Sequence, residues 1–236
     1  MSTAIEVQDL TLVLGGRKIL DVPTFTLQAG ESVSLTGPNG AGKSSLLFVM
    51  SLLQEPTTGR LKYFGKNLEE HPRLELQRRM AMVFQKPMLL DLNVLENVDL
   101  GLKFRGISRK ERNRRIHDSL EQMEVDHLAH RRARSLSGGE AQRVAIAQAL
   151  VVEPEIIFLD EPFSNLDKEI REELMIHIDQ LLRKQRITTV MVTHHRREAD
   201  VMTDGVYWME DGSIVSREPI RRENSSGVNK RGKVLK

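Results

Sequence analysis

The chain has 236 residues, 39% hydrophobic and 29% charged, a balance that indicates a soluble, folded protein with room for a sizeable core. It contains no cysteine, which excludes disulfide bonds and thiolate metal sites. The net charge is only +2 and no apolar run approaches the roughly 18 residues of a membrane span, so neither a nucleic-acid partner nor a spanning segment is indicated.

The first part of the chain is expected to be mostly antiparallel β structure. Residues 4–14 alternate apolar and polar side chains, and residues 19–27 resume strand character after a glycine turn. Pro23 interrupts the second segment and cannot donate a backbone hydrogen bond, which suggests an edge strand or a bulge. Residues 32–36 form a further short strand.

A glycine-rich segment follows this strand and runs into an apolar helix that begins near Leu46. Its residues are Gly37, Pro38, Asn39, Gly40, Ala41, Gly42, Lys43, Ser44 and Ser45. Strand, glycine-rich loop and helix form the setting of a phosphate-binding P-loop, because glycines let backbone N–H groups converge and the helix start adds unpaired ones. Lys43 is expected to reach the β- and γ-phosphates, and Ser44 is expected to bind Mg²⁺. The alternative is a turn that only caps an ordinary helix.

The middle of the chain changes from β to helical character. Residues 80–84 form an apolar run that predicts a buried strand, which ends at Gln85. Residues 86–134 have apolar side chains at helical spacing, and we expect an inserted helical subdomain there. A capping-box pattern, Ser108 with Glu111, opens its most basic helix. The arginines of this helix predict a solvated face, with a docking surface as the alternative.

A second capping-box pattern, Ser137 with Glu140, predicts the start of another helix. The apolar run at residues 156–159 predicts a buried strand, and Asp160 and Glu161 follow it directly.

The last part of the chain alternates helix and strand. Asp167 is expected to open a long amphipathic helix. Residues 188–192 predict a buried strand that ends close to His194, and residues 206–215 predict a terminal hairpin. From about residue 217 the chain is polar and basic, and we expect a disordered tail over 217–236.

Polar side chains therefore follow several predicted strands, namely Gln85, Asp160, Glu161 and His194. The carboxyl ends of parallel strands share one edge of an α/β sheet. We expect these four side chains to lie beside the P-loop.

These motifs together resemble the ATP-binding subunit of an ABC transporter over roughly residues 4–216. The matching elements are the P-loop, the Q-loop Gln85, the signature Leu136-Ser137-Gly138-Gly139-Glu140, the Walker B pair Asp160 and Glu161, the D-loop Ser164-Asn165-Leu166-Asp167 and the switch His194. The resemblance implies an α/β fold, with a P-loop NTPase (RecA-like) core that has a mainly parallel sheet, an N-terminal antiparallel β subdomain and an inserted α-helical subdomain. It implies one domain at 1–216, made of a core (1–85 and 135–216) and a helical subdomain (86–134).

The resemblance also implies ATP and Mg²⁺ as ligands. Ser44, Asp160 and Gln85 would hold the metal, and Glu161 would act as general base on the attacking water. His194, Lys43 and Gln85 would complete the catalytic set. The nucleotide would contact residues 37–45, Gln85, Asp160 and His194 of one copy, and Ser137, Gly138 and Gly139 of another.

Partners follow from the same resemblance. Two chains would sandwich two ATP molecules head to tail, with Asp167 at the seam, so that the homodimer forms on ATP binding. Transport would require integral membrane permease subunits, which would hold the chain at the cytoplasmic face of the cell membrane and dock near residues 87–90. An extracytoplasmic solute-binding protein would take part indirectly, and no nucleic acid is expected.

Two positions depart from the family pattern. Leu14 stands where an aromatic residue commonly stacks on adenine, so stacking is weaker or another group substitutes, and GTP is expected to compete better than usual. His195 follows the switch histidine, where Asp is usual, and this change could alter the hydrogen bonding that orients His194.

Within the family, residues 83–90 and 100–106 look most similar to tungstate-type oxyanion (tungstate or molybdate) importer subunits. Phosphate or amino-acid import stays open, as does a non-transport ABC ATPase that acts as a nucleotide-dependent binding module. A GTPase of the Asn-Lys-x-Asp type is excluded, because Asn229-Lys230 is followed by Arg231-Gly232.

Overall fold

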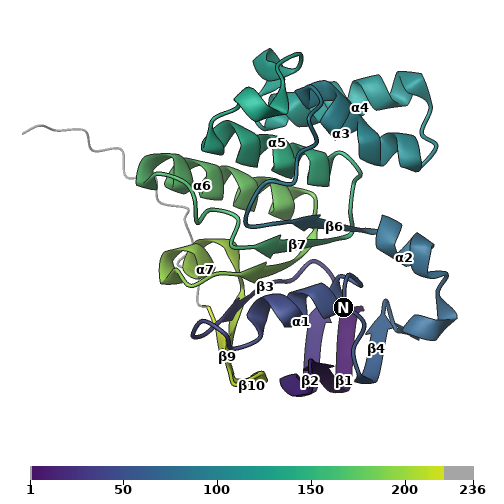
Figure 1. The fold of residues 1–236 in the computed structure, drawn as a ribbon, viewed down its shortest axis with the longest axis vertical. Helices are drawn as coiled ribbons and strands as arrows, with labels where there is room; N and C mark the ends of the chain where they lie inside the picture. The colour runs from purple at the N-terminus through teal and green to yellow at the C-terminus, as the bar shows by residue number, and fades with distance from the viewer. Residues whose placement is uncertain (1, 221–236) are drawn as a thin grey trace, which may run out of the picture.

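Two β-sheets organise the chain, which a computed structural model describes for residues 2–220 (Figure 1). The smaller sheet is antiparallel, in the order β2-β1-β4-β5. Its strands are β1 (Thr3–Leu14), β2 (Arg17–Gln28), β4 (Thr58–Tyr63) and β5 (Lys66–Asn67). Pro23 is exposed on the edge strand β2, as its missing N–H group predicts.

The larger sheet has six strands in the order β10-β9-β3-β8-β7-β6. Neighbours are parallel from β9 through to β6, and β10 alone is antiparallel to its neighbour. The strands are β3 (Ser32–Thr36), β6 (Met80–Val83), β7 (Ile156–Asp160), β8 (Thr188–Val192), β9 (Gly205–Glu210) and β10 (Ser213–Pro219). Because parallel neighbours are joined by crossovers, the carboxyl ends of β3, β6, β7 and β8 meet at one edge.

Each face of the larger sheet has its own hydrophobic core. Strand β7 shows this best, since Ile156 and Phe158 belong to one cluster and Ile157 and Leu159 to the other. Helix α1 (Lys43–Met50) and the smaller sheet pack on the first face, and the larger helices pack on the second (Figure 1). The helices of the second face are α3 (Val94–Phe104), α4 (Arg109–Gln122), α5 (Gly138–Leu150) and α6 (Lys168–Lys184).

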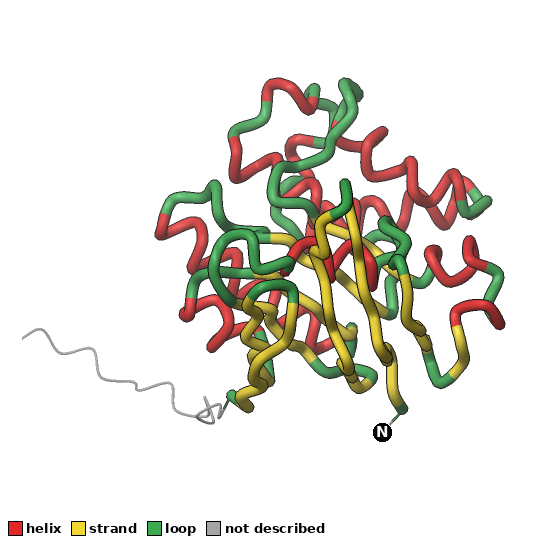
Figure 2. Tube along the Cα trace, turned by 60° about the horizontal axis from the view of Figure 1, so that its bottom comes forward, coloured by secondary structure: helices red, strands yellow, loops and turns green. Residues whose placement is uncertain are grey.

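The remaining helices are short. α2 (Arg73–Arg78) precedes β6, and α7 (Arg196–Met202) links β8 to β9. Three single turns of 3-10 helix cover Leu68–Glu70, Asp126–Leu128 and Ala133–Ser135. Figure 2 shows the strands gathered in the middle and lower part of the molecule, with the helical segment above them. Among the described residues, no helix combines the length and the hydropathy needed to cross a bilayer.

The predicted capping box at the start of α4 forms only in part. The Ser108 hydroxyl accepts from the Glu111 N–H at 3.4 Å, but the Glu111 carboxylate accepts from Arg114 and Arg115 instead of the Ser108 backbone. Three hydrogen bonds from charged guanidinium groups outweigh one bond from a neutral backbone N–H at this exposed end. These arginine bonds hold the pKa of Glu111 down, at about 2.

The arginines of α4 are only partly a solvated face. Arg112 is mostly buried and lies 2.7 Å from the buried Asp99 of α3, so it joins the two helices. Arg115 bridges Glu111 and Glu153. The prediction holds for Arg114, which is exposed, and is wrong for Arg112, because the carboxylate on α3 could not be paired with it from sequence.

The hairpin at the end of the chain is longer than expected. β10 continues to Pro219 and pairs with β9, so residues 217–219 do not belong to the predicted tail. Arg217 supports this extension, because its guanidinium lies 2.6 Å from Glu31 and 5.3 Å from the centre of the Tyr207 ring. The rest of the predicted tail, residues 221–236, lies outside the described residues.

Candidate functional site

The glycine-rich loop joins the end of β3 to the start of α1, as the sequence predicts. Gly37 has φ 139°, and a Cβ there would lie 2.1 Å from the carbonyl oxygen of Met209. Gly42, the N-cap of α1, has φ 90°, and a Cβ there would lie 2.8 Å from a methyl carbon of Leu20. Both glycines are required because neighbouring strands approach the loop too closely for a side chain.

Lys43 closes the loop from inside. Its Nζ donates to the carbonyl oxygens of Gly37 and Pro38, at 3.0 and 2.8 Å. Burial lowers the pKa of Lys43, and the nearby carboxylates of Glu161 and Asp160 oppose that shift. The cation therefore sits between the loop and two acidic side chains.

Ser44 and Asp160 form a pair of oxygen ligands next to the loop. The Ser44 hydroxyl donates to Oδ1 of Asp160 at 2.9 Å, although 116 residues separate them in the chain. Burial raises the pKa of Asp160, and the Ser44 hydrogen bond works in the opposite direction. A cation bound beside this buried carboxylate would stabilise its ionised form.

Glu161 is the meeting point of three strand ends. Nε2 of Gln85, after β6, donates to Oε2 of Glu161 at 2.9 Å, and Nδ1 of His194, after β8, lies 3.5 Å from the same oxygen. Asn165 donates from Nδ2 to the backbone carbonyl of Gln85 at 3.1 Å. Glu161 itself has φ 44°, a left-handed conformation, and its N–H donates to the carbonyl of Val192 on β8.

His195 lies against the switch histidine. The two imidazole rings are 4.0 Å apart between centres and inclined at 43°. The His195 N–H donates to the Thr193 hydroxyl at 3.0 Å, and that hydroxyl in turn donates to the buried Glu198. His195 therefore contacts His194 through its ring, and its backbone is anchored from the other side.

The signature segment caps α5 but lies apart from the P-loop. Ser137 N–H donates to Oε2 of Glu140 at 2.7 Å and the Ser137 hydroxyl accepts from Glu140 N–H at 3.3 Å, so the predicted capping box is complete. The Ser137 backbone bond holds the pKa of Glu140 below its usual value. Gly138 and Gly139 lie near the Asn165 carbonyl and the Ile170 side chain, and none of these residues lines the pocket at the P-loop.

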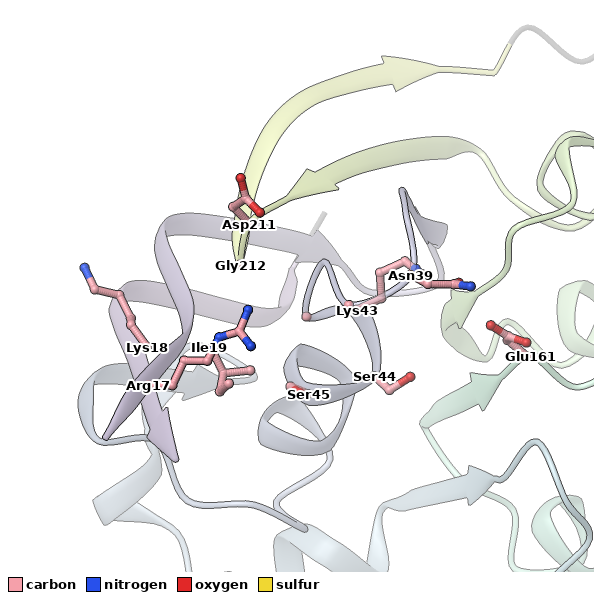
Figure 3. A pocket seen from close by; sticks show the side chains of 12 residues that line it. Arg17, Lys18, Ile19, Asn39, Lys43, Ser44, Ser45, Glu161, Asp211 and Gly212 are labelled. Atoms are coloured by element: carbon pink, nitrogen blue, oxygen red, sulfur yellow. The ribbon is translucent and has the colours of Figure 1, made fainter. Parts of the chain in front are cut away.

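A pocket of about 500 Å³ opens at the P-loop (Figure 3). Its lining residues are Arg17, Lys18, Ile19, Asn39, Gly40, Gly42, Lys43, Ser44, Ser45, Glu161, Asp211 and Gly212. The sequence reasoning identified the loop and Glu161 but missed the wall formed by the start of β2 and by the β9–β10 turn. It looked for this wall at Leu14, which is 46% exposed and does not line the pocket.

Comparisons with known proteins agree on one family. A family model described as "ABC transporter" matches residues 20–164. The iron import protein FbpC 1 of Rhizobium meliloti is 39% identical over 84% of this chain, which spans 56% of that relative. The sulfate/thiosulfate import protein CysA of Yersinia pseudotuberculosis is 37% identical, with 93% and 63% covered. The tungstate uptake protein TupC of Peptoclostridium acidaminophilum is 34% identical, with 89% and 96% covered.

Solved structures agree with these relatives. A structure of cbiO1 from Clostridium perfringens, described as part of the ABC transporter complex cbiONQ, has a TM-score of 0.84 at 26% identity and covers 93% of this chain and 89% of its own. A dimeric structure of the ATP-binding cassette MJ0796, bound to ADP and Pi, has a TM-score of 0.83 at 31% identity. It covers 93% of this chain and 100% of its own. The two matches agree with the expected α/β fold, including the antiparallel β subdomain and the helical portion.

Proposed function

The chain belongs to the ABC transporter family, and from this premise we propose that it is the ATP-binding subunit of an importer. In this role it hydrolyses ATP and so drives a solute through separate membrane subunits. The observation that carries the proposal is the cluster of Gln85, Glu161 and His194 at the ends of three parallel strands, next to a P-loop pocket. A glycine turn that only caps a helix needs no such cluster.

We propose a role for Lys43 and for each residue of the cluster, and their contacts support these roles. The polyphosphate of ATP runs along the loop, and Lys43 moves its three N–H donors from the loop carbonyls to the phosphate oxygens. Glu161 accepts the proton of the attacking water, and Gln85 fixes one carboxylate oxygen so that the other faces the substrate. His194 lies beside the same carboxylate and donates to the γ-phosphate.

The residues around Ser44 fit Mg²⁺. A hydroxyl and one carboxylate oxygen, together with substrate phosphates and water, form the hard oxygen set that Mg²⁺ prefers. Among the described residues there is no group of three or more His, Cys, Asp or Glu side chains that could hold a metal alone, which agrees with a metal bound mainly through substrate. Mg²⁺ would supply neutralisation of the developing phosphate charge, and the Gln85 amide oxygen is our proposed third protein ligand.

We propose that the working site needs two copies of the chain. P-loop helix α1 and signature helix α5 pack on opposite faces of the larger sheet, and Ser137, Gly138 and Gly139 do not line the pocket of their own chain. A helix N-terminus with exposed N–H groups is an anion site that a second ATP molecule can use. Asp167, at the start of α6, is then expected at the seam of a head-to-tail homodimer.

Membrane subunits have a matching surface next to Gln85. A groove of about 230 Å³ runs along β6 and is lined by the methionines Met80, Met82 and Met88. Met88 is 67% exposed and Leu90 is 56% exposed, whereas Leu89 packs against the core. Flexible methionines suit a docked apolar helix. We propose that residues 86–134 form the helical subdomain and dock a permease helix here, which holds the chain at the cytoplasmic face of the membrane.

The proposed cargo is an oxyanion of the tungstate or molybdate type, captured first by an extracytoplasmic solute-binding protein. Two relatives support this, because tungstate and sulfate are both tetrahedral oxyanions and the tungstate protein is matched over 96% of its length. Iron, spermidine/putrescine and maltose import proteins match at comparable identity, so the cargo is decided by experiment. Phosphate and amino-acid import remain the alternatives.

The experiment that tests the proposed function is ATP hydrolysis as a function of protein concentration. If each site is shared between two chains, the rate per molecule falls on dilution below the self-association constant and recovers at higher concentration. A rate per molecule that is constant over this range would refute the shared site. Absence of hydrolysis at every concentration, with and without the membrane subunits, would refute the ATPase and leave a nucleotide-dependent binding module.

A further inference from the structure

We propose that Arg17 and Asp211 contact the nucleotide base and make the pocket accept guanine nucleotides as readily as adenine nucleotides. The proposal rests on the nucleotide-binding function above and adds the groups that read the base. It starts from the wall of the pocket that the P-loop does not form, where Arg17, Lys18, Ile19, Asp211 and Gly212 lie (Figure 3).

This wall has a fixed position relative to the P-loop. Gly212 N–H donates to the carbonyl of Ala41 in the loop at 3.1 Å, and the Gly212 carbonyl accepts from Asp21 N–H at 2.9 Å. A Cβ at Gly212 would lie 2.4 Å from the carbonyl oxygen of Ile19, so the β9–β10 turn is wedged between the loop and β2. With phosphates bound along the loop, the nucleoside extends toward this wall.

The wall carries two charges that the protein itself does not neutralise. Lys18 pairs with Asp21 at 2.8 Å, and Glu210 accepts from the Trp208 indole at 3.1 Å. By contrast, within residues 2–220 the side chains of Arg17 and Asp211 have no hydrogen bond or ion pair. Figure 3 shows the Arg17 guanidinium turned toward the space beside Ile19 and Ser45. A cation and an anion left unpaired on one pocket wall are available to a ligand.

Guanine satisfies both groups. Its O6 and N7 atoms are a bidentate acceptor pair for a guanidinium, and its N1–H and amino group are adjacent donors for a carboxylate. Adenine presents an amino donor beside N7, which a guanidinium cannot pair with along that edge, and it offers a carboxylate the amino group alone. With adenine, Arg17 can instead stack its planar face on the base, in place of the aromatic residue absent at Leu14.

The test compares binding of ADP, GDP and pyrophosphate by calorimetry, so that no turnover is needed. Asp211→Asn keeps the turn, because Asn tolerates the φ of 44° found at this position. It should weaken GDP about tenfold relative to ADP, since one bidentate pair is lost. Arg17→Lys keeps the positive charge but loses the planar guanidinium and its bidentate donors. It should weaken the binding of both nucleotides about tenfold while leaving the binding of pyrophosphate unchanged.

One variant serves as the matched control. Glu210→Gln removes the same charge from the residue that precedes Asp211, at the end of β9, which does not line the pocket. It should not change the ratio of GDP to ADP affinity.

The outcomes separate this proposal from the proposed function. If wild-type protein binds GDP at least as well as ADP and Asp211→Asn reverses the order, the assignment is supported. Equal losses for ADP, GDP and pyrophosphate in both variants would overturn it, because pyrophosphate has no base for the two residues to contact. A wild-type preference for ADP above tenfold would also overturn it. Failure of all three ligands to bind wild-type protein would refute the nucleotide site itself, and this assignment with it.

Discussion

Replacement of Glu161 by Gln isolates the step of water activation. Gln has nearly the same shape, and its carbonyl oxygen can still accept the 2.9 Å hydrogen bond from Gln85. The left-handed backbone at φ 44° is no worse for Gln than for Glu, because both carry a Cβ. The fold and the rim of polar side chains should therefore persist, and only the base and one negative charge are lost.

The proposed role of Glu161 as general base sets the size of the expected loss of activity. A positioned general base contributes about 10²–10⁴ in rate, which corresponds to about 3–5 kcal/mol of activation free energy. We expect kcat to fall by this factor. ATP affinity should stay the same or increase, because Glu161 is also an anion close to Lys43 and to the site of the phosphates. With binding intact and turnover blocked, the ATP-bound dimer should accumulate.

The assay measures phosphate release and, on the same samples, the dimer fraction by light scattering with Mg-ATP. Glu155→Gln is the matched control. Glu155 lies just before the first residue of β7, at the end of the strand opposite to Glu161, and the substitution removes only an exposed ion pair with Arg79. The control should keep wild-type turnover and form no trapped dimer. A kcat for Glu161→Gln within threefold of wild type would refute the base assignment.

Other perturbations test other parts of the site. Lys43→Ala should weaken ATP at least tenfold by calorimetry, because a charge-assisted contact to phosphate is lost; unchanged affinity would contradict the P-loop assignment. Asp160→Asn should raise the Tm of the nucleotide-free chain at pH 7 while it abolishes Mg²⁺-dependent activity. Burial raises the pKa of Asp160, so the folded state binds this proton more tightly than the unfolded chain does. The free energy of unfolding therefore falls as pH rises from the ordinary value of 3.8 through the raised pKa. A lower Tm for the Asn variant than for the wild type at pH 7 would show that this sign is wrong. Met88→Asp should reduce capture of the membrane subunits about tenfold and change folding stability by less than about 0.5 kcal/mol, whereas Ile176→Asp, an exposed apolar position on α6, should leave capture intact.

The rim of polar side chains could be predicted because it depends on local patterns. An apolar run that stops at a polar residue marks a strand end, and parallel strands bring such ends to one edge. Gln85, Glu161 and His194 converge for this reason, although their roles in hydrolysis stay predictions. The same local logic predicted the capping box of Ser137 with Glu140.

The pocket wall formed by the start of β2 and the β9–β10 turn could not be predicted, because these two segments approach each other from opposite ends of the chain. Arg17 is an exposed residue at the start of β2 and Asp211 lies in the β9–β10 turn, and the close packing of Gly212 against Ile19 brings both to one pocket. Arg112 was misjudged for a related reason, since its buried partner Asp99 lies on a different helix. Pairings of this kind are tertiary, and sequence periodicity carries no information on them.

The alternation along β7 also bears on how the protein loses its structure. Four of the five residues of β7 are divided between the two hydrophobic clusters, so loss of either cluster removes the packing from one side of the strand that supports the other. Although it has two separate hydrophobic cores, the protein should therefore unfold as a single cooperative unit around its central strands.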